Sequence, residues 1–432
     1  MKSKNSILVV GAGFVGLATA TFFARKGHFV TVAEINPNTI DPLNRGELHF
    51  HEPKLATEFR KAVKAGKLVV KQPTEEDYTG SRFVIIAIDS VDQRNWTMKS
   101  DAFEQMADWI GSKRYSPRHT VFLKSTNILG FSKFFRGCLD ATPYGKEVEL
   151  IVNPEFLAEG TAYEDTAEPS RVVIGTLDGK SGGAGEKLVR SLYPKAVPFI
   201  NTTWKGAELI KLGSNLYLSH RLTFINELAE YARSINLDIP TICEGIGLDP
   251  RIGTHYFKPG LGFGGSCLPK DCRLINSEEL EPKFDFQVAY TALLVNDDIL
   301  ESIVSRLKDR LGNLKGKKIA LLGVAFKPEA DDVRGSQVLK LAQKLKRRGA
   351  RLSIYDPFVD GIDSPVDGKW DTESSWKDAL KSANAVVVGT AHSAFKKITP
   401  AAASKLVRRK LVIDNYGHLN FKSWTKAGFK FA

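Results

Sequence analysis

The feature that most constrains the fold is a glycine-rich turn near the start of the chain. An apolar run, ILVV at 7–10, leads into GAGFVG at 11–16, and a helical pattern follows. Gly11 permits the tight turn, Gly13 lets the backbone approach a pyrophosphate, and Gly16 lets the helix pack on the strand. The start of that helix would offer N–H donors to phosphates. The pattern predicts a dinucleotide-binding βαβ unit, with a glycine-rich turn that binds nothing as the alternative.

The next strand ends in an acidic residue at the position that dinucleotide sites use for the ribose. The segment HFVTVAE at 28–34 reads as a strand, and its last residue is Glu34. A carboxylate there accepts hydrogen bonds from a ribose 2′-hydroxyl and repels a 2′-phosphate. No arginine follows immediately, so the sequence favours NAD over NADP.

Further apolar segments continue the strand series, with helical patterns between them. They are RFVIIAI at 82–88, TVFLKST at 120–126 and VELIVNP at 148–154. Strands that alternate with helices indicate a parallel, doubly wound sheet. We therefore expect residues 1–202 to form an N-terminal, NAD-binding Rossmann-like domain.

The pattern changes in the middle of the chain. Residues 204–235 carry apolar positions at helical spacing without a proline, and residues 285–311 form a second long helical stretch. Long helices with an apolar face often pair subunits. The sequence thus predicts a helical central domain at 203–310 and a homodimer, or a higher homo-oligomer, through these helices.

A second strand and helix series occupies the C-terminal part of the chain. The segments at 319–326, 350–356, 385–390 and 410–414 read as strands. The series echoes the first one, but GVAFKP replaces GAGFVG and lacks the full glycine fingerprint. We expect residues 311–432 to form a second Rossmann-like domain. The predicted fold class is α/β, with two doubly wound domains joined by a helical central domain.

Composition and charge narrow the class of protein. The apolar runs in the 432 residues stay below the roughly 18 residues that a membrane helix needs, and the N-terminal run leads at once into the glycine turn, so we expect a cytoplasmic protein. The formal net charge is +12, but the basic residues are scattered, which favours anionic small molecules over nucleic acid. The four cysteines form no CxxC pair and no cluster with histidine, so we expect no metal site.

One cysteine stands in an unusual setting, GFGGSCLPKD at 262–271. Ser266 or Cys267 can occupy the N-cap of a following helix, a position that lowers a thiol pKa. Asp271 follows Cys267 by four residues and so shares its helix face, whereas Lys270 points partly away. A lone cysteine is more often a buried filler than a nucleophile. The glycines before this one and the acid after it favour a nucleophile.

A series of motifs runs in order over nearly the whole chain. They are GAGFVGLATA near the start, KST at 124–126, NPEFLAEGTA at 153–162, AELIKLGSN at 207–215, DPRIG at 249–253, GFGGSCLPKD at 262–271, GVAFKPEADDVRGS at 323–336 and YDP at 355–357. In this order the motifs resemble those of the nucleotide-sugar dehydrogenases, the UDP-glucose/GDP-mannose dehydrogenase family. The resemblance implies two successive oxidations at C6 of one sugar with two NAD molecules, and it leans toward UDP-glucose as the substrate and UDP-glucuronate as the product.

The resemblance also implies chemical roles for particular residues. Cys267 matches the nucleophile, whose thiolate adds to an aldehyde to give a thiohemiacetal and, after the second hydride transfer, a thioester that water hydrolyses. The other matches are Lys211 and Asn215, which stabilise charge on oxygen; Asp271, which works with Lys211 and a water in proton transfer; Glu155, which assists thioester hydrolysis; and Thr126, which helps to hold water.

Binding positions follow from the same resemblance. For NAD they are Gly11, Gly13, Phe14, Val15, Gly16, Glu34, Ser90, Thr126, Glu159 and Arg334. For the nucleotide sugar they are Glu155, Phe156, Leu157, Ala158, Glu159, Lys211, Asn215, Arg251, Lys258, Phe263, Gly264 and Lys327. Arg251 resembles an arginine that reaches the substrate of a neighbouring subunit, which would make dimerisation part of the site.

The chain departs from the family pattern at several places. Ser90 and Val91 stand where threonine and proline are usual, Glu34 stands where aspartate is usual, and DNYGH at 414–418 replaces a DGR-type segment. KST is followed by NILG rather than VPPG. These changes bear on the details of cofactor and substrate contacts, but none of them removes a catalytic group.

Three alternatives stay open. A sister enzyme for GDP-mannose shares the cysteine and much of the pattern, whereas enzymes for UDP-N-acetylmannosamine fit less well. A single-step dehydrogenase of the hydroxyisobutyrate type has a similar fold and a lysine, but it would leave the GGSC segment without a purpose. The alternative from another class is a catalytically inactive NAD-binding or nucleotide-binding protein.

Overall fold

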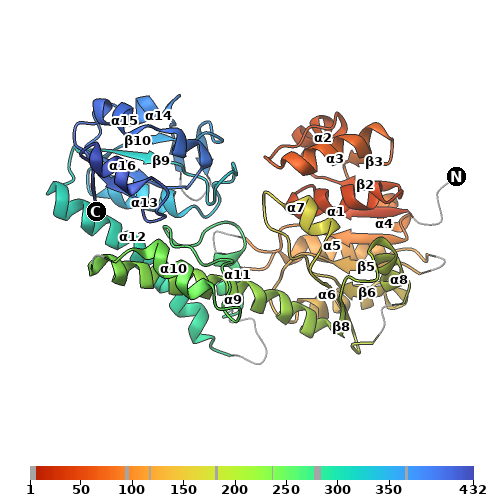
Figure 1. Ribbon diagram of the computed structural model, residues 1–432. Coiled ribbons are helices and arrows are strands. Elements are labelled where there is room, and N and C mark those ends of the chain that lie inside the picture. The colour runs from red at the N-terminus through yellow and green to blue at the C-terminus, as the bar shows by residue number, and fades with distance from the viewer. Residues whose placement is uncertain are drawn as a thin grey trace. The chain divides into compact units, whose positions relative to one another are not determined.

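The structure is a computed structural model (Figure 1). It describes residues 6–92, 97–115, 118–180, 183–235, 237–276, 284–364 and 368–432. The chain forms two compact units, of which the first comprises residues 1–214 and 274–284 and the second residues 215–273 and 285–432. The three-domain division at 1–202, 203–310 and 311–432 stays a prediction.

The first unit is built on an eight-stranded sheet with the order β3-β2-β1-β4-β5-β6-β7-β8. Neighbouring strands are parallel except β6 and β7, which pair antiparallel. The strands are β1 Ile7–Val10, β2 Val30–Ala33, β3 Leu68–Lys71, β4 Phe83–Ile86, β5 Thr120–Leu123, β6 Glu149–Val152, β7 Val172–Thr176 and β8 Phe199–Thr203.

Helices lie between these strands. They are α1 Phe14–Arg25, α2 Pro37–Asn44, α3 Pro53–Lys64, α4 Glu75–Thr79, α5 Ser100–Gly111, α6 Phe131–Asp140, α7 Ala162–Ala167 and α8 Gly183–Leu192, with a 3-10 turn at Gly145–Glu147. The central strands are buried along their whole length, as expected of a parallel sheet that is covered on both faces. The alternation of strands and helices, with the sheet covered on both faces, is the doubly wound pattern that the sequence predicts.

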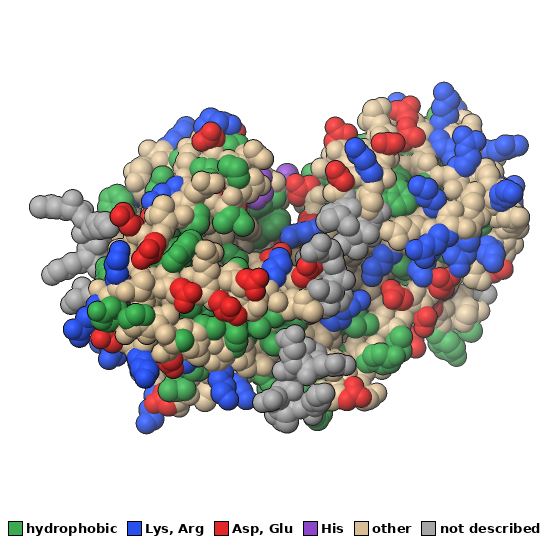
Figure 2. Space-filling model, turned by 180° about the vertical axis from the view of Figure 1, so that it is seen from behind, with side chains coloured by type: hydrophobic (Ala, Val, Ile, Leu, Met, Phe, Trp, Pro, Cys, Tyr) green, Lys and Arg blue, Asp and Glu red, His purple; other side chains and the backbone are tan. Residues whose placement is uncertain are grey.

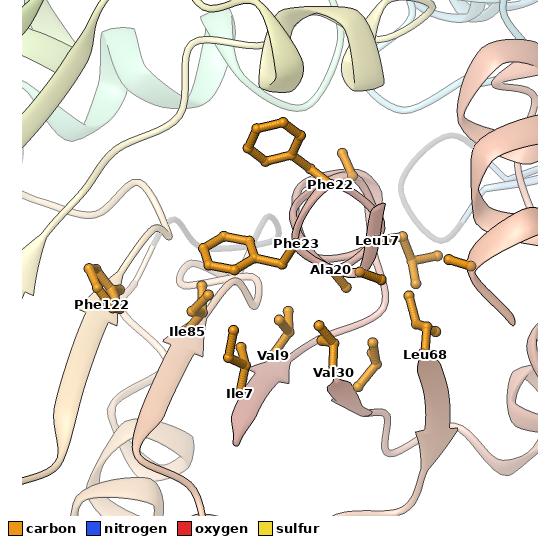
Figure 3. Packing of buried hydrophobic residues seen from close by; sticks show 14 of the residues in the cluster. Ile7, Val9, Leu17, Ala20, Phe22, Phe23, Val30, Leu68, Ile85 and Phe122 are labelled. Carbon is orange, nitrogen blue, oxygen red and sulfur yellow. The ribbon is translucent and has the colours of Figure 1, made fainter. Parts of the chain in front are cut away.

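The core under α1 explains why the first strand and helix come together. In Figure 3, Ala20 and Phe23 of α1 point toward the sheet, over Val9 and Ile85. Each large apolar side chain of this kind contributes roughly 1.5–3 kcal/mol when it is fully buried. Gly16, on the face of α1 next to the turn, leaves no room for a side chain, because a Cβ there would lie 1.9 Å from the carbonyl oxygen of Gly11.

The long helix α9, Trp204–Ser234, is anchored to the first sheet by two buried side chains. The indole Nε1 of Trp204 donates to the carbonyl oxygen of Leu150 at 3.0 Å. The carboxylate of Glu208 accepts from the backbone N–H groups of Gly130 at 2.7 Å and Ser132 at 2.8 Å, at the start of α6. Burial raises the pKa of Glu208, although these two N–H groups oppose the shift. The first turns of α9 are therefore fixed on the sheet.

The second unit has a five-stranded parallel sheet with the order β10-β9-β13-β14-β15. Its strands are β9 Lys318–Leu322, β10 Arg351–Tyr355, β13 Ala385–Val388, β14 Leu411–Ile413 and β15 Lys430–Phe431, and β11 Ile362–Ser364 pairs antiparallel with β12 Gly368–Trp370. Its helices are the rest of α9, α10 Ile239–Gly247, α11 Leu268–Leu274, α12 Gln287–Leu311, α13 Gln337–Arg347, α14 Trp376–Leu380, α15 Pro400–Leu406 and α16 Phe421–Lys426, with a 3-10 turn at Ser393–Lys397.

Two apolar clusters cover the second sheet, and alternate residues of its strands belong to different clusters. Ile319 and Leu321 of β9 pack with α12 and α13, whereas Ala320 and Leu322 pack with α14 and α16. This alternation is the period of two that a sheet covered on both faces requires. The α/β fold with two Rossmann-like sheets and a helical region between them in sequence is thus confirmed.

Charged side chains of both signs are interspersed over the face drawn in Figure 2. In the most basic segment, KLKRRGAR at 344–351, Lys344 and Arg348 each pair with Glu301 of α12, at 2.8 Å. Among the helices of the described residues, none is long and apolar enough to cross a membrane.

Candidate active site

The glycine turn after β1 is shaped to receive a ligand. Gly11 has a φ of +101°, and a Cβ there would lie 2.6 Å from the carbonyl oxygen of Ala87, so the turn needs glycine at this position. Gly13 precedes α1, and a Cβ built on it meets nothing within 4 Å. The space beside Gly13 and the start of α1, at Phe14 and Val15, fit a pyrophosphate bound by backbone N–H groups.

Glu34 lies beside this turn, as the spacing predicts. Its Oε2 accepts from the backbone N–H of Ala12 at 3.1 Å, and its Oε1 accepts from that of Asn36 at 2.7 Å. The carboxylate is only partly buried, so its remaining lone pairs can accept from ribose hydroxyls. The turn and Glu34 together fit NAD.

Two loops at the carboxyl ends of β4 and β5 are joined by hydroxyl groups. Ser90 Oγ donates to the carbonyl oxygen of Thr126 at 2.5 Å, and Ser125 Oγ donates to that of Ile88 at 2.7 Å. Ser90 is buried. The structure therefore brings Ser90 and Thr126 together at the edge of the sheet where ligands of doubly wound folds bind.

A buried ion pair links α9 to the loop after β6. Lys211 Nζ lies 2.9 Å from Glu155 Oε1, and the two side chains are 5% and 10% exposed. Glu155 Oε2 also accepts from the backbone N–H of Leu157 at 2.8 Å. Removal of either charge would leave the other buried without its partner, which costs several kcal/mol. The sequence-predicted residues Glu155 and Lys211 thus form one polar centre in the first unit.

The rest of this loop is held by its neighbours. The ring of Phe156 lies 3.8 Å from the guanidinium carbon of Arg171 and 5.5 Å from Lys211 Nζ. Ala158 N–H donates to Asp165 Oδ2 at 2.9 Å. Glu159 follows in the same loop and is half-buried.

Sequence reasoning gave no role to two cations at this centre. Lys124 Nζ lies 3.4 Å from the carbonyl oxygen of Asn153. Burial, together with the charge of Lys211, lowers the pKa of Lys124 to about 8, although Glu155 opposes the shift. Burial also lowers the pKa of Arg171. A cavity of about 200 Å³ is lined by both cations and by Glu155. The sequence signal for Lys124 is its place in the KST motif at the end of a buried strand.

In the second unit, Cys267 lies at the end of the glycine-rich stretch at 262–267, which we call the glycine segment. Gly262 and Gly265 have φ values of +96° and +83°, which favour glycine. The thiol is exposed, and the carbonyl oxygen of Cys267 accepts from Asp271 N–H at 2.8 Å, one residue before α11 begins. Cys272 is instead buried, with its Sγ 3.1 Å from Ser219 Oγ, and none of the four cysteines, all of them described, forms a disulfide.

Asp271 stands at the start of α11, and its carboxylate is almost fully buried. Asn215 Nδ2 of α9 donates to Asp271 Oδ2 at 2.5 Å. Lys270 Nζ forms an ion pair with Asp271 Oδ1, and the expectation that Lys270 points partly away from Cys267 stays a prediction. Two of the predicted catalytic residues, Asn215 and Asp271, are therefore in direct contact.

The other predicted substrate residues of this unit divide into buried and exposed ones. Phe263 is buried, and its backbone N–H and carbonyl both bond to the amide of Asn296 in α12, at 2.7 and 2.9 Å. Sequence reasoning did not find Asn296, because nothing in its helical surroundings distinguishes it. Lys258 is exposed, and the side chain of Arg251 is 87% exposed and pairs with Asp249 at 2.6 Å.

Lys327 and Arg334 lie on one loop, residues 323–336, that follows β9. Lys327 is half-buried beside the ring of Phe326, with Nζ 5.8 Å from the ring centre. Arg334 forms an ion pair with Asp332 at 2.6 Å. This loop also contacts the glycine segment, because a Cβ on Gly264 would lie 2.5 Å from the carbonyl oxygen of Gly335. Among the described residues, histidine, cysteine and acidic side chains form no group that could hold a metal ion.

Comparison with known proteins gives matches over almost the whole chain. Residues 5–197 match the NAD binding domain of the UDP-glucose/GDP-mannose dehydrogenase family, residues 205–298 its central domain and residues 320–420 its UDP binding domain. The chain is 32% identical to the UDP-glucose 6-dehydrogenase YwqF of Bacillus subtilis, over 95% of this chain and 92% of that one. It is 30% identical to a UDP-glucose 6-dehydrogenase of Rhizobium meliloti, over 99% and 98%.

Solved structures give the same result. A UDP-glucose dehydrogenase from the hyperthermophilic archaeon Pyrobaculum islandicum is similar with a TM-score of 0.85 and 30% identity, over 97% of each chain. A UDP-D-ManNAc dehydrogenase from Pyrococcus horikoshii is similar with a TM-score of 0.84 and 25% identity, over 99% of this chain and 98% of that one.

Proposed function

The chain belongs to the UDP-glucose/GDP-mannose dehydrogenase family, and we propose that it oxidises the C6 alcohol of UDP-glucose to the carboxylate of UDP-glucuronate with two molecules of NAD. The observation that carries the proposal is the surroundings of Cys267. Its exposed thiol follows glycines in left-handed conformations and precedes by one helical turn the buried carboxylate of Asp271. In a four-electron oxidation such a nucleophile can hold the aldehyde as a covalent adduct, from which the second hydride leaves.

In the first oxidation the C6 hydroxyl loses a proton and C6 loses a hydride. NAD supplies the hydride acceptor in this step and in the second one. We assign proton removal to Asp271 and an ordered water, acting with Lys211. An ammonium and an amide suit charge that develops on oxygen, so we assign its stabilisation to Lys211 and Asn215. The contact between Asn215 and Asp271 supports these roles, because each fixes the orientation of the other.

In the second oxidation the thiolate of Cys267 adds to the aldehyde and forms a C–S bond. Loss of a hydride from C6 and of a proton from its hydroxyl converts the thiohemiacetal into a thioester. Water then attacks the thioester, the C–S bond breaks, and Cys267 leaves as the thiolate. We assign to Glu155 the removal of a proton from that water and to Thr126 its retention. The nearly complete burial of Glu155 supports a carboxylate that is fixed in one orientation.

We further propose that the protein works as a homodimer. Tyr217, Phe224 and Tyr231 are spaced by seven residues along α9, so they share one helix face, and they are 59%, 48% and 65% exposed. A stripe of large aromatic side chains is costly to leave in water and suits a second copy of the chain. Light scattering during size exclusion should give the mass of a dimer, and Tyr217→Lys combined with Phe224→Lys should shift it toward the monomer. A monomeric wild-type protein would overturn this proposal.

The number of reduced cofactors per sugar tests the reaction itself. With UDP-glucose in limiting amount, absorbance should report two NADH per sugar consumed. One NADH per sugar would leave a single-step dehydrogenase, and none would leave an inactive nucleotide-binding protein. A panel with GDP-mannose and UDP-N-acetylmannosamine decides the sugar, since the similarity to a UDP-D-ManNAc dehydrogenase keeps that substrate open.

A substitution of the thiol tests the covalent step. Cys267→Ser should keep NAD binding but stop the release of UDP-glucuronate, because an alkoxide is a poorer leaving group than a thiolate. Cys138→Ser is the matched control: Cys138 lies half-buried in α6, a helix that carries none of the proposed catalytic residues. Normal turnover by Cys267→Ser would remove the nucleophile assignment.

A test of the cofactor follows from Glu34. Its carboxylate lies at the ribose position and would repel a 2′-phosphate, so NADP should support turnover far more weakly than NAD. Glu34→Gln should narrow the preference by about tenfold, since one unfavourable charge contact of roughly 1.4 kcal/mol is removed. Equal rates with both cofactors in the wild-type protein would contradict this role.

A further inference from the structure

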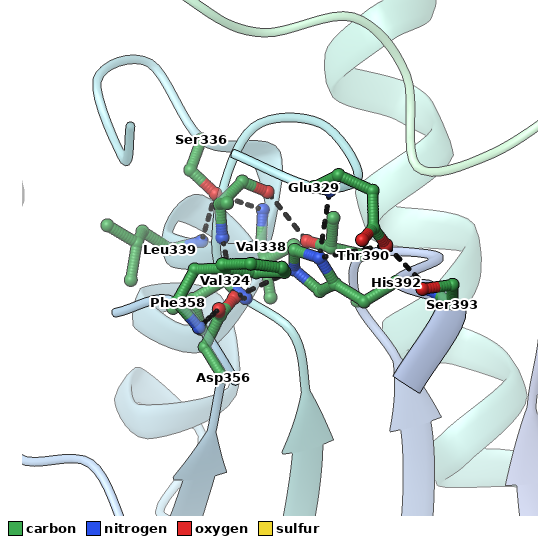
Figure 4. Close-up of polar contacts among 12 residues, drawn as sticks. Val324, Glu329, Ser336, Val338, Leu339, Asp356, Phe358, Thr390, His392 and Ser393 are labelled. Atoms are coloured by element: carbon green, nitrogen blue, oxygen red, sulfur yellow. Dashed lines mark hydrogen bonds and ion pairs between the residues drawn. The ribbon is translucent and has the colours of Figure 1, made fainter. Parts of the chain in front are cut away.

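The acidic residue at the end of β10 is fully engaged by the backbone around it. Oδ2 of Asp356 accepts from the N–H groups of Val324 at 2.7 Å and Ala325 at 3.1 Å, and Oδ1 accepts from that of Phe358 at 2.9 Å (Figure 4). The carboxylate is buried. These bonds fix the start of the loop at residues 323–336, which carries Lys327 and Arg334.

A buried histidine, His392, also contacts the carboxylate of Asp356. The ring of His392 is completely buried, and its Nε2 lies 3.1 Å from Asp356 Oδ2. Its Nδ1 accepts from the backbone N–H of Glu329 at 3.0 Å. Because Nδ1 is an acceptor, the ring proton lies on Nε2 and is donated to Asp356. His392 is therefore a neutral bridge between the end of β10 and the middle of the loop at 323–336 (Figure 4).

The residue that His392 holds has a strained backbone. Glu329 has a φ of 58°, in the left-handed region that costs a residue with a side chain about 1–3 kcal/mol. Two contacts from the segment at 392–393 offset this cost. One is the bond from Glu329 N–H to His392, and the other is the bond from Ser393 N–H to Glu329 Oε1 at 2.6 Å. Both contacts hold Glu329 in this conformation.

The loop that His392 holds packs directly behind the glycine segment of Cys267. A Cβ on Gly265 would lie 2.8 Å from the ring of Phe326, and a Cβ on Gly264 would lie 2.5 Å from the carbonyl oxygen of Gly335. The backbones of Gly264 and Gly335 thus lie in direct contact, Gly265 packs against the ring of Phe326, and Cys267 follows two residues after Gly265. A shift of the loop at 323–336 would be passed to the thiol, because close-packed backbones do not deform independently.

We propose that His392 is a positioning residue for the reaction: as a neutral ring it locks the loop at 323–336, and through that loop it fixes the glycine segment and the thiol of Cys267. Only the kinetic consequence rests on the proposed function; the lock itself rests on the contacts within the second unit. His392 acts through other residues, so its loss should lower kcat and leave the affinity for NAD, bound in the first unit, unchanged.

Three substitutions separate the two bonds of the ring. His392→Phe keeps an aromatic ring beside Phe358 and Phe395, whose ring centres lie 5.2 and 5.6 Å away, and removes both bonds. His392→Asn places an amide oxygen where Nδ1 stands and can keep the bond from Glu329. His392→Gln places an amide nitrogen where Nε2 stands and can keep the bond to Asp356.

Amide hydrogen exchange measured by mass spectrometry tests the lock without reference to activity. His392→Phe should speed exchange in peptides that cover 324–336 and also 262–268, with smaller effects in His392→Asn and His392→Gln. The His392→Phe variant should also lower kcat by about tenfold, as expected when a reacting group is displaced by a fraction of an ångström. Its KM for NAD should stay within about twofold of the wild-type value. Unchanged exchange at 262–268 in all folded variants would overturn the proposal, and so would an unchanged kcat in an active enzyme.

His119→Phe is the matched control. His119 is likewise buried, its Nδ1 lies 2.7 Å from the carbonyl oxygen of Ser81, and its ring lies 4.5 Å from that of Tyr115, all in the first unit. It should leave exchange at 262–268 and kcat unchanged; if it reproduced both effects, general destabilisation would replace positioning as the explanation. Should His392→Phe fail to fold, the two amide variants decide the question. If the wild-type protein oxidises no nucleotide sugar, the proposed function fails while the exchange data still decide the role of His392.

Discussion

The turns after the first strands of the two sheets start alike and end in different chemistry. After β1, residues 11–13 lead directly into α1, whereas after β9 the chain runs through residues 323–336 before α13 begins. Each first strand is followed at once by a glycine, Gly11 with φ +101° and Gly323 with φ +87°. In each unit the parallel neighbour of that strand ends close to an acidic residue, Glu34 or Asp356.

The difference lies in which groups satisfy the backbone donors. Gly13 precedes α1 and has no side chain to cap the helix. Within the turn itself, the carboxylate of Glu34 accepts from the N–H of Ala12. Before α13, Ser336 Oγ accepts from Val338 and Leu339, and Asp356 accepts from two N–H groups of its turn. In the described structure, α1 thus starts without a side-chain cap, whereas side chains cap both the second turn and the start of α13. This difference suits ligand binding at the first turn and the positioning role that we propose for the second.

The largest effect that this comparison predicts comes from Gly13→Ala. The new methyl group meets nothing within 4 Å, and the φ of −80° suits alanine, so the thermal midpoint should not change. The same methyl group would occupy the space through which a pyrophosphate approaches, so NAD affinity should fall about 100-fold, or about 2.7 kcal/mol. Titration calorimetry measures the affinity.

A second glycine serves as the control for Gly13. A Cβ on Gly137, within α6, also meets nothing within 4 Å, so Gly137→Ala should keep NAD affinity and add about 0.5–1 kcal/mol to stability, as alanine favours a helix. Wild-type affinity in Gly13→Ala would mean that the first turn is no more open to a ligand than the second.

Much of the first turn is predictable from the sequence because its signals are local. The glycines of GAGFVG and the acid at Glu34 lie within one βαβ unit, and each answers a steric or hydrogen-bonding demand of its immediate neighbours. The same holds for Cys267, since glycines before a residue and a helix after it can be read from adjacent positions. The strand series is likewise written in apolar runs, which is why the α/β class follows from the sequence.

The second turn could not be predicted in this way, because its partners are distant in the chain. His392 and Asp356 are 36 residues apart and Glu329 and His392 are 63 apart, and no periodicity connects them. Lys124 is a similar case: its low pKa arises from burial and from Lys211, which a helix far along the chain supplies. The apolar face of α12 shows that one side of the helix is buried, but not that β9 and α13 cover that side.

A stability effect of intermediate size comes from Asp356→Asn. The amide keeps one acceptor and presents a donor to N–H groups, so we expect a loss of about 2 kcal/mol in the free energy of unfolding at pH 7 and no change in NAD affinity. Burial raises the pKa of Asp356, but the bonds from His392 and from backbone N–H groups outweigh it and hold the pKa below its usual value.

The pH dependence of Asp356→Asn has a definite sign. A lowered pKa in the folded state contributes stability above the unfolded pKa of about 3.9, and this contribution is lost as the pH falls through the folded value. Urea unfolding from pH 7 to pH 4 should therefore show a nearly constant difference between wild type and variant that shrinks only in stronger acid. A difference that grows on acidification would mean that the ionised carboxylate does not stabilise the second turn.

The smallest predicted effect is the difference in thermal midpoint between loss of a buried helix N-cap and loss of an exposed one. Ser336→Ala removes the acceptor for Val338 N–H and Leu339 N–H, which typically costs about 1 kcal/mol. Asn420 caps α16 in the same way, through Ser423 N–H at 2.9 Å, but it is exposed. Because water can replace the amide of Asn420 and cannot reach the buried site of Ser336, Ser336→Ala should lower the thermal midpoint more than Asn420→Ala. Equal shifts would mean that α13 is open to water at its start, as α1 is, and would remove the difference between the two turns.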